Sequence, residues 1–320
     1  MTETTPSDPL DVSVCIPVFN EKSALRETLL ELQVMMASLP YSYEFILIDD
    51  GSSDGCLETI RDIPDVRIIR HQRNLGGGIA RLTGIRRARG RWILQTDADG
   101  TYPVERVPEM LKQMEQADMV IGARVRESAT DWRWLRIMMK GLLKWLASIM
   151  AGYRIPDLNS GLRVYDRELA LHYAYLYPPG HSIMSTMTLA FLTDRHRVEF
   201  VAIDYNVRKG PSSFHPIRDT YNYFITILRT VVFFDPLRVL MPVVLGFGLV
   251  ALLFSIRNLI LFASLGSVPP LLWLVAFLFF VLAILSDQFS RISRQIRHGR
   301  ILNLYDRVIV EETEPWQKES

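Results

Sequence analysis

Two long apolar runs near the carboxyl end constrain this 320-residue chain most strongly, and they occupy residues 236–255 and 268–286. Arg257, Asn258 and a turn containing serine and glycine separate them. Each run has close to the roughly 20 residues that a helix needs to cross a bilayer. Two buried helices of a soluble protein are the alternative, but residues 271–285 carry no charge, no glycine and no polar face, which favours lipid. The sequence therefore predicts a two-helix transmembrane hairpin.

Basic residues flank the hairpin on its outer sides. Arg229 and Arg238 lie before or at the start of the first run, whereas only Arg257 is near the intervening turn. The second run is followed by Arg291, Arg294, Arg297, His298 and Arg300. Because positively charged flanks stay in the cytoplasm, both ends of the hairpin and all of the chain before it are predicted to be cytoplasmic. The protein is then integral to the plasma (inner) membrane.

The composition excludes some classes of partner. The charges nearly cancel, with 36 Lys and Arg against 35 Asp and Glu, so no global field points to nucleic acid. Cys15 and Cys56 have neither metal-site spacing nor a disulfide framework, so we expect a reducing compartment. The chain does not begin with a basic segment followed by an apolar one, so we expect no cleaved signal peptide. Residues 1–10 are predicted to be a loose tail.

Before the hairpin, strand-like apolar runs alternate with helical patterns. The predicted strands are residues 12–18, 44–48, 66–70, 91–95 and 119–122. The predicted helices are residues 21–38, 57–63, 79–89 and 104–116. Such alternation predicts an α/β fold with a mostly parallel sheet and helices on both faces. Ligands of such sheets bind beyond the carboxyl ends of the strands, so we expect the chemistry there.

Two further segments combine aromatic, apolar and cationic residues. Within residues 131–151, Arg136, Lys140 and Lys144 recur every four residues beside several tryptophans. This pattern is typical of an interfacial amphipathic helix, although a core helix with a solvated basic stripe fits this segment equally well. The apolar runs downstream favour the interfacial interpretation. A second such segment, residues 217–234, leads into the first apolar run.

The sharpest chemical signal is the segment ILQTDADG at residues 93–100. It delivers the carboxylates of Asp97 and Asp99 to the carboxyl end of a predicted strand. Two hard oxygen ligands with open positions beside them suit Mg²⁺ or Mn²⁺ that bridges a diphosphate. Such a metal would stabilise the charge that grows on a departing nucleotide diphosphate. An Asp-x-Asp pair alone also occurs in plain solvated loops, so the surrounding motifs decide.

Two other predicted strands end in polar motifs. One leads into Pro17, Asn20 and Glu21, and the next leads into Asp49 and Asp50. Together with the Asp-x-Asp motif, in this order and spacing, these segments resemble family 2 glycosyltransferases of the GT-A fold. The two apolar runs resemble the polyprenyl-phosphate branch of that family, which includes dolichol-phosphate mannose synthases.

The resemblance extends over about residues 11–300 and implies a domain organisation. We expect a GT-A domain over residues 11–215, a juxtamembrane amphipathic helix over 216–235, two transmembrane helices over 236–290 and a cytoplasmic tail over 291–320. The oligomeric state stays open, and a homo-oligomer is one option.

The same resemblance implies a donor site at the strand ends. Pro17, Asn20 and Glu21 would line the pocket of the nucleotide base, and Asp49 and Asp50 would contact base or ribose. A carboxylate suits an N–H donor of uracil or guanine. For the acidic pair, a plain turn is the alternative.

Gly76, Asp97 and Asp99 complete the implied donor site. Gly76 lies in a glycine-rich stretch that resembles the family's entry to a helix, where the backbone could approach the nucleotide closely. A loop that only needs positive φ angles fits this stretch as well. Asp97 would bind the donor and, together with Asp99, the catalytic metal. Asp157, in the segment DLNSGLR, would be the catalytic carboxylate, with a structural turn acid as the alternative.

An acceptor phosphate needs cations near the membrane side, and the sequence supplies several. The run at residues 208–213 also resembles the family's Arg-x-Gly-x-Ser-Lys element. The expected residues are Arg124, Arg136, Arg208, Lys209 and Ser212. Arginine binds phosphate oxygens bidentately. Ser213 stands where many relatives have lysine, and Lys209 is the candidate to replace that lysine. Plain surface solvation is the alternative for any one of these cations, and for Arg136 and Lys140 above all.

The implied reaction is an inverting transfer of a sugar from a UDP- or GDP-sugar to undecaprenyl or dolichyl phosphate. A lipid monophosphate has a second pKa near 6, so it needs orientation more than deprotonation. Two alternative functions would require other sequence features. A haloacid-dehalogenase-type phosphatase would use Asp97 as nucleophile, but it would carry this motif on its first strand. A processive polysaccharide synthase would have more spans and a Gln-x-x-Arg-Trp element.

Overall fold

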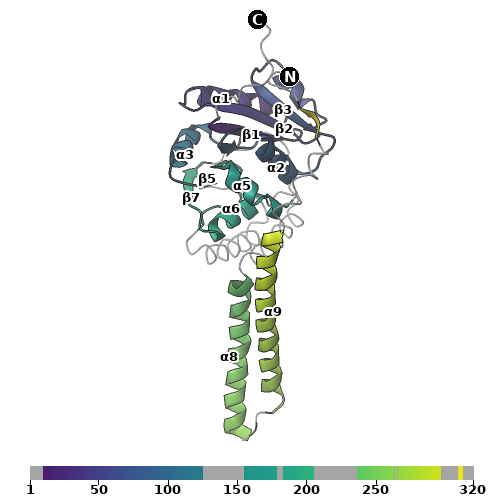
Figure 1. Ribbon diagram of the computed structural model, residues 1–320, viewed down its shortest axis with the longest axis vertical. Helices are drawn as coiled ribbons and strands as arrows, with labels where there is room; N and C mark the ends of the chain where they lie inside the picture. Colours follow the sequence, from purple (N-terminus) through teal and green to yellow (C-terminus); the bar gives the residue numbers. More distant parts are fainter. Residues whose placement is uncertain are drawn as a thin grey trace. The chain divides into compact units, whose positions relative to one another are not determined.

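The computed structural model describes residues 10–124, 155–178, 183–204, 236–262, 264, 266–296 and 309–312. The chain divides into two compact units (Figure 1). The first comprises residues 1–224 and 300–320, and the second comprises residues 225–299. The polypeptide therefore builds most of the first unit, forms the second, and then returns to the first.

The first unit is built on a mixed sheet. Its strands are β1 (Val12–Val18), β2 (Tyr43–Asp49), β3 (Val66–His71), β4 (Trp92–Gln95), β5 (Met119–Arg124), β6 (Arg163–Asp166), β7 (Val198–Ile203) and β8 (Ile309–Glu312). Within the described residues the strands lie in the order β7-β5-β6-β4-β1-β2-β3-β8. β6 and β8 pair antiparallel with their neighbours, and the remaining pairs are parallel. The predicted mostly parallel α/β sheet is confirmed.

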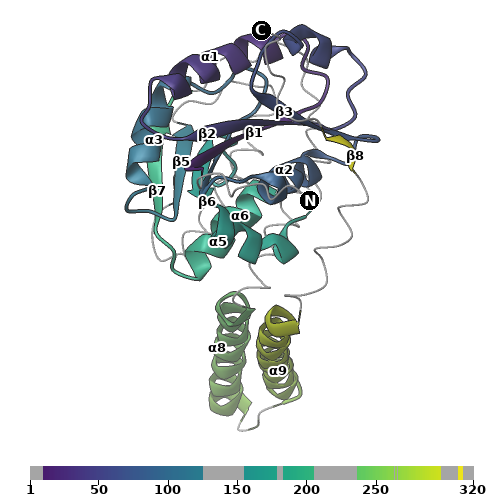
Figure 2. The same ribbon diagram turned by 45° about the horizontal axis from the view of Figure 1, so that its top comes forward.

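Helices cover both faces of this sheet. They are α1 (Leu25–Ala37), α2 (Gly77–Arg87), α3 (Val107–Gln113), α5 (Arg167–His172) and α6 (Ile183–Thr193), with the short 3₁₀ helices η1 (Cys56–Ile60), η2 (Val104–Arg106) and η3 (Ala174–Leu176). α1 lies on one face of the central strands and α2 on the opposite face (Figure 2). This cover on both sides explains why β1 and β2 are almost continuous apolar runs.

The packing of α1 on the sheet follows helical spacing. Leu25, Leu29, Leu32 and Met36 are fully buried and recur every three or four residues along one face of the helix. Full burial of one such side chain stabilises the fold by about 1.5–3 kcal/mol. This packing fixes the helix that follows the β1 loop, and with it the carboxyl edge of the sheet.

Three features depart from the sequence expectations. β6 lies antiparallel between β4 and β5. The carboxyl-terminal residues, expected to be a tail, contribute β8 at the edge beside β3. The helix α8 (Pro236–Phe262) continues through Arg257 and Asn258, where the apolar run was expected to break. The guanidinium carbon of Arg257 lies 5.9 Å from the centroid of the Phe254 ring, three residues earlier on the helix, which is a cation–π contact.

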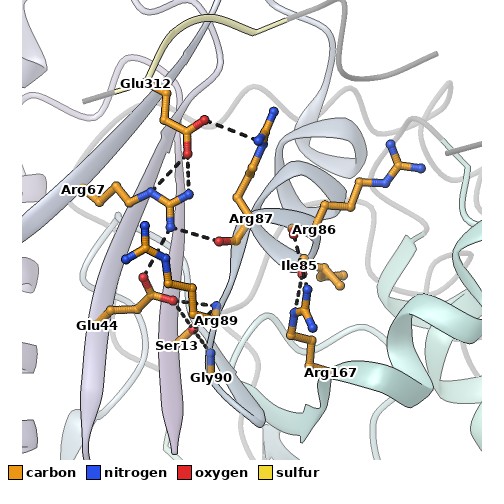
Figure 3. Close-up of polar contacts among 10 residues, drawn as sticks. All are labelled: Ser13, Glu44, Arg67, Ile85, Arg86, Arg87, Arg89, Gly90, Arg167 and Glu312. Carbon is orange, nitrogen blue, oxygen red and sulfur yellow. Dashed lines mark hydrogen bonds and ion pairs between the residues drawn. The ribbon is translucent and has the colours of Figure 1, made fainter. Parts of the chain in front are cut away.

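A buried arginine on β3 joins β8 to the sheet (Figure 3). The Nε of Arg67 donates to the Glu312 carboxylate of β8 at 3.1 Å, and its Nη1 lies 3.4 Å from Glu44 of β2. Nη1 also donates to the carbonyl oxygen of Arg87 at 2.9 Å. A buried charge is costly unless it is paired and hydrogen-bonded. We name these residues the Arg67 cluster (Glu44, Arg67, Arg87 and Glu312). Their contacts therefore tie β8 to the sheet.

The described residues of the second unit form the helices α8 and α9 (Val268–Ile296). The stretches Val239–Phe262 and Val268–Ser290 are long and apolar enough to cross a membrane, with mean hydropathies of 2.6 and 2.7. The rings of Phe247 and Phe279 stack between the helices at 5.6 Å. Most large apolar side chains of both helices are exposed, which suits a lipid environment better than water.

Candidate active site

The loops that follow β1 and β2 are joined by hydrogen bonds. The backbone N–H of Asn20 donates to Ser52 Oγ at 3.0 Å, and the N–H of Ser53 donates to Asn20 Oδ1 at 2.9 Å. The N–H of Lys22 donates to the Asp54 carboxylate at 2.9 Å. Asn20 has a φ of 56°, a left-handed conformation that asparagine adopts more readily than most residues. Asn20 therefore brings two predicted donor motifs into one surface.

Pro17 and Glu21, the other residues expected at the base pocket, lie on either side of Asn20 and are half-buried. Pro17 is in register with Ile48 of β2. The carbonyl oxygen of Glu21 accepts hydrogen bonds from the N–H groups of Ala24 and Leu25, where α1 begins. Both residues lie at the carboxyl edge of the sheet, and their contact with a base stays a prediction.

Asp49 is fully buried at the end of β2. Its Oδ1 accepts a hydrogen bond from the N–H of Ser52 at 2.9 Å. Its Oδ2 lies 3.1 Å from Arg70 Nε without the alignment of a hydrogen bond. Arg70 is 45% exposed, so this ion pair links a buried carboxylate to the surface. Both oxygens of Asp49 are thus engaged inside the protein, and its contact with base or ribose stays a prediction.

Asp50 has a role that the sequence did not indicate. Its Oδ1 lies 2.8 Å from His71 Nδ1 and accepts from the N–H of Leu75 at 3.0 Å, while its Oδ2 accepts from the N–H of Gly76 at 2.8 Å. His71 Nε2 lies 3.0 Å from the hydroxyl of Thr83 on α2. Asp50 therefore holds the glycine turn in place, and its contact with base or ribose stays a prediction.

Gly76 immediately precedes α2 and has a φ of 98°, which a residue with a Cβ rarely adopts. The two backbone N–H groups bound by Asp50 belong to this turn. Gly51, in the preceding loop, also has a positive φ of 76°, and a Cβ there would lie 2.6 Å from the backbone carbon of Arg73. The loop after β2 therefore packs directly against the turn that leads into α2.

The two acids of the Asp-x-Asp motif differ in environment. The Oδ1 of Asp97 accepts a hydrogen bond from Arg81 Nη2 of α2 at 2.6 Å, and the Asp97 side chain is 29% exposed. Asp99 is buried, and its Oδ1 accepts from the hydroxyl and the N–H of Thr101 at 2.6 and 3.2 Å. Both acids thus lie after β4, as the sequence predicts, with one facing outward and the other fixed in a turn.

The segment after residue 154 packs against this motif. A Cβ at Gly161 would lie 2.5 Å from Asp97 Oδ2 and 3.0 Å from the Tyr102 hydroxyl. The N–H of Gly161 donates to that same hydroxyl at 2.6 Å. The chain can pass so close to Asp97 only because position 161 has no side chain. Asp97 is therefore confined between Arg81 on one side and Gly161 on the other.

Asp157 and Arg124 form an ion pair. Arg124 Nε and Nη2 donate to Asp157 Oδ2 and Oδ1 at 2.7 and 3.1 Å, and the N–H of Asn159 donates to Oδ1 at 3.0 Å. Burial alone would raise the pKa of the Asp157 carboxyl, but the hydrogen bonds and charge of Arg124 outweigh it and lower that pKa. The candidate catalytic acid and the candidate acceptor cation thus bind each other, and Asp157 is a weak base.

Arg163 hydrogen-bonds to the same segment, and the sequence analysis did not predict it as a site residue. It is fully buried, and its guanidinium donates to the carbonyl oxygens of Ser160 and Met184 and to the hydroxyl of Thr188. Burial lowers its pKa to about 10. The sequence signal was the arginine itself, since a charged residue that becomes buried needs a dedicated set of acceptors.

Several predicted residues lie outside the described part of the chain. These are Arg136, Lys140, Arg208, Lys209 and Ser212, together with the amphipathic segments 131–151 and 217–234. In the described residues no group of three or more His, Cys, Asp or Glu side chains could hold a metal ion. Among the described residues at the carboxyl edge of the sheet, Asp97 and Asp99 are therefore the candidates for binding a metal ion.

The family profile described as "Glycosyl transferase family 2" matches residues 13–173, which is half of the chain and includes each acid of this edge. The chain belongs to glycosyl transferase family 2. It is a glycosyltransferase, as the sequence predicts. An undecaprenyl-phosphate 4-deoxy-4-formamido-L-arabinose transferase of Pseudomonas syringae pv. syringae is 30% identical to it, over 80% of this chain and 75% of that protein.

Other relatives agree with this membership. A dodecaprenyl-phosphate galacturonate synthase of Rhizobium johnstonii is 26% identical, over 71% of this chain and 68% of that protein. Among solved structures, glucosyl-3-phosphoglycerate synthase of Mycobacterium tuberculosis with Mn²⁺, UDP-glucose and phosphoglyceric acid superposes with a TM-score of 0.55. It is 17% identical and covers 69% of this chain and 80% of that one. This family 2 glycosyltransferase therefore has the GT-A fold.

The family's use of a divalent ion fits the residues present. Asp97 and Asp99 offer hard oxygen donors of the kind that Mg²⁺ and Mn²⁺ prefer. Asp97 is partly exposed, and its charged partner is the Arg81 side chain. Of the described residues, these two acids suit the role best.

Proposed function

We propose that this protein transfers a sugar from a UDP- or GDP-sugar to a polyprenyl phosphate, undecaprenyl or dolichyl, with inversion at the anomeric carbon. The observation that carries the proposal is one polypeptide that contains both a family 2 catalytic unit and two helices of membrane length. Two relatives whose names specify polyprenyl-phosphate products or substrates support it. The catalytic unit would act at the cytoplasmic face of the inner membrane, where positive flanks remain.

In this mechanism an oxygen of the lipid phosphate attacks the anomeric carbon of the donor. A new C–O bond forms as the bond to the nucleotide diphosphate breaks, and the diphosphate leaves with the electron pair. Asp97 and Asp99 would hold Mg²⁺ or Mn²⁺, which supplies charge stabilisation for the leaving group. Pro17, Asn20 and Glu21 would bind the base.

Asp157 would serve this reaction without removing a proton. Its lowered pKa makes it a poor base, and a phosphate monoester already carries most of two negative charges at neutral pH. Its two hydrogen bonds to Arg124 instead fix the guanidinium at the end of β5. We therefore assign Arg124 to the acceptor phosphate and Asp157 to the orientation of Arg124. Arg136, Arg208, Lys209 and Ser212 remain the further candidates for that phosphate.

The phosphatase and the processive synthase are not favoured. The Asp-x-Asp motif follows β4, the fourth strand along the chain, whereas a phosphatase of that type would carry it on its first strand. A channel-forming synthase would need more spans than the two membrane-length helices found in the described residues.

A direct assay tests the proposal. The purified full chain in detergent is incubated with a panel of UDP- and GDP-sugars, Mn²⁺ and either undecaprenyl or dolichyl phosphate, and glycolipid is detected by mass spectrometry. We expect one donor to give a polyprenyl phosphosugar with inverted anomeric configuration by NMR. Release of inorganic phosphate without glycolipid would instead indicate the phosphatase.

Substitution of the acids tests the metal assignment. Asp97→Asn and Asp99→Asn keep the size of each side chain but remove its charge, so each should lower Mn²⁺-dependent transfer by about 100-fold or more. Glu109→Gln, on the exposed face of α3 away from these motifs, is the matched control and should leave transfer unchanged. Substantial transfer by both aspartate variants would contradict the assignment of the metal to Asp97 and Asp99.

A further inference from the structure

Arg81 lies one turn into α2 and reaches the Asp-x-Asp motif. Its Nη1 donates to the carbonyl oxygen of Gly77 at 3.0 Å, and its Nη2 donates to Asp97 Oδ1 at 2.6 Å. The Arg81 side chain is 10% exposed, whereas that of Asp97 is 29% exposed. The arginine is therefore the more buried partner of an ion pair in the middle of the donor site.

Arg81 has hydrogen-bonding capacity that the described protein leaves unused. Its Nε is buried and has no hydrogen-bond partner among the described residues. Ser160 Oγ, next to the glycine that packs against Asp97, is also buried without a partner there. Buried polar atoms are nearly always hydrogen-bonded, so these two atoms beside Asp97 are groups that a water molecule or a polar ligand would satisfy.

The space around Asp97 limits how a metal can bind it. Oδ1 is occupied by Arg81, and Oδ2 faces Gly161 so closely that a Cβ there would lie 2.5 Å away. A divalent ion that binds Asp97 must therefore displace the guanidinium or share a carboxylate with it. Sharing is unfavourable because the two cations repel each other at short range.

We propose that Arg81 is an exchangeable counter-charge of the donor site. It neutralises Asp97 while the donor is absent, and it releases Asp97 and turns to the diphosphate when metal and nucleotide-sugar bind together. The planar guanidinium suits phosphate oxygens, which it can bind through two N–H groups. This inference rests on the proposed function, because it requires a metal at Asp97.

The exchange couples the two ligands. Arg81 opposes binding of the metal alone but attracts the diphosphate, so each ligand binds more tightly in the presence of the other. Such coupling is reciprocal, since each ligand changes the affinity for the other by the same factor. A purely structural arginine would instead give weaker or unchanged binding of both ligands when it is replaced.

Separate binding measurements test this coupling. Mn²⁺ binding is followed by electron paramagnetic resonance and UDP binding by calorimetry, with the full chain in detergent micelles. Arg81→Gln should bind Mn²⁺ alone about tenfold more tightly, because a competing cation is gone, and UDP with Mn²⁺ about tenfold more weakly. Arg87→Gln makes the same change six residues later on α2, in the Arg67 cluster, and should change neither affinity.

Two outcomes would overturn the proposal while the metal site stands. The first is Mn²⁺ binding by Arg81→Gln that is unchanged or weaker, when the unaltered chain binds Mn²⁺ and Asp97→Asn does not. The second applies if Arg81→Gln fails to fold in a thermal unfolding assay. Arg81→Met, which keeps much of the length of the side chain but loses its charge, would then bind Mn²⁺ alone no more tightly than the unaltered chain. No Mn²⁺ binding by the unaltered chain, with or without UDP, would refute the metal of the proposed function and this proposal with it.

Discussion

The ion pair of Asp157 and Arg124 makes the stability of the catalytic unit depend on pH. Because the pKa of Asp157 is lowered in the folded protein, its stabilising contribution is present above the ordinary aspartate pKa, about 3.9, and is lost as pH falls toward the lowered value. Asp157→Asn should therefore reduce the free energy of unfolding by about 2 kcal/mol at pH 7. The difference should shrink below about pH 4.

Urea unfolding followed by tryptophan fluorescence at several pH values measures this difference. Asp62→Asn is the control, since Asp62 also pairs with an arginine but is 67% exposed and should contribute little. A stability gap that stays constant through pH 3 would mean that Asp157 acts through packing and not through its charge.

Gly161 is the residue at which the smallest change should have the largest effect. In Gly161→Ala the new methyl group meets Asp97 Oδ2 at 2.5 Å, so the carboxylate must move, and its hydrogen bond to Arg81 is disturbed. A displacement of about 1 Å in an active site can cost about 100-fold in rate, and we expect a loss of that order in kcat. Gly246→Ala, where nothing described lies within 4 Å, should be harmless. Full activity of Gly161→Ala would show that Asp97 tolerates displacement.

At the scale of elements, the Asp50 carboxylate connects β2, β3 and the start of α2. His71 on β3 bonds to Asp50 and Thr83, and Asp50 in turn holds the N–H groups of Leu75 and Gly76. His71→Ala should loosen the glycine turn and raise the KM for the nucleotide-sugar several-fold, with the KM for the lipid unchanged. His71→Asn, whose amide can still donate to Asp50, should restore much of the affinity for the donor. Equal changes in both KM values would indicate a general loss of structure.

Elements that carry local signals could be predicted, whereas their distant partners could not. The parallel strands β1 to β4 and the loops after them were visible as apolar runs followed by acids or glycine. β6 is four residues long, reads RVYD and has no alternation, so its antiparallel insertion beside β4 depends on buried Arg163 and Tyr165 and not on periodicity. Arg81 was overlooked because a basic residue on a helix is usually solvated. Only the fold brings it to Asp97.

At the scale of the whole molecule, the chain leaves the catalytic unit for the two membrane-length helices and then returns to it as β8. Arg70 of β3 is in register with Glu311 of β8, and Glu312 pairs with buried Arg67. A strand can join this sheet only if it lies on the same side of the membrane as the sheet. The pairing therefore supports a hairpin whose two ends share one side, independently of the arginine flanks.

Cross-linking tests this topology. Arg70→Cys with Glu311→Cys places two thiols on directly opposed residues of an antiparallel pair, within reach of a disulfide. We expect an intramolecular disulfide in isolated membranes after mild oxidation, identified by mass spectrometry of the linked peptides. Glu199→Cys with Glu311→Cys is the control, because β7 lies at the opposite edge of the sheet and should give no link. The native Cys15 and Cys56 are buried. Absence of the first disulfide, in protein that retains transferase activity, would place the carboxyl-terminal segment away from β3.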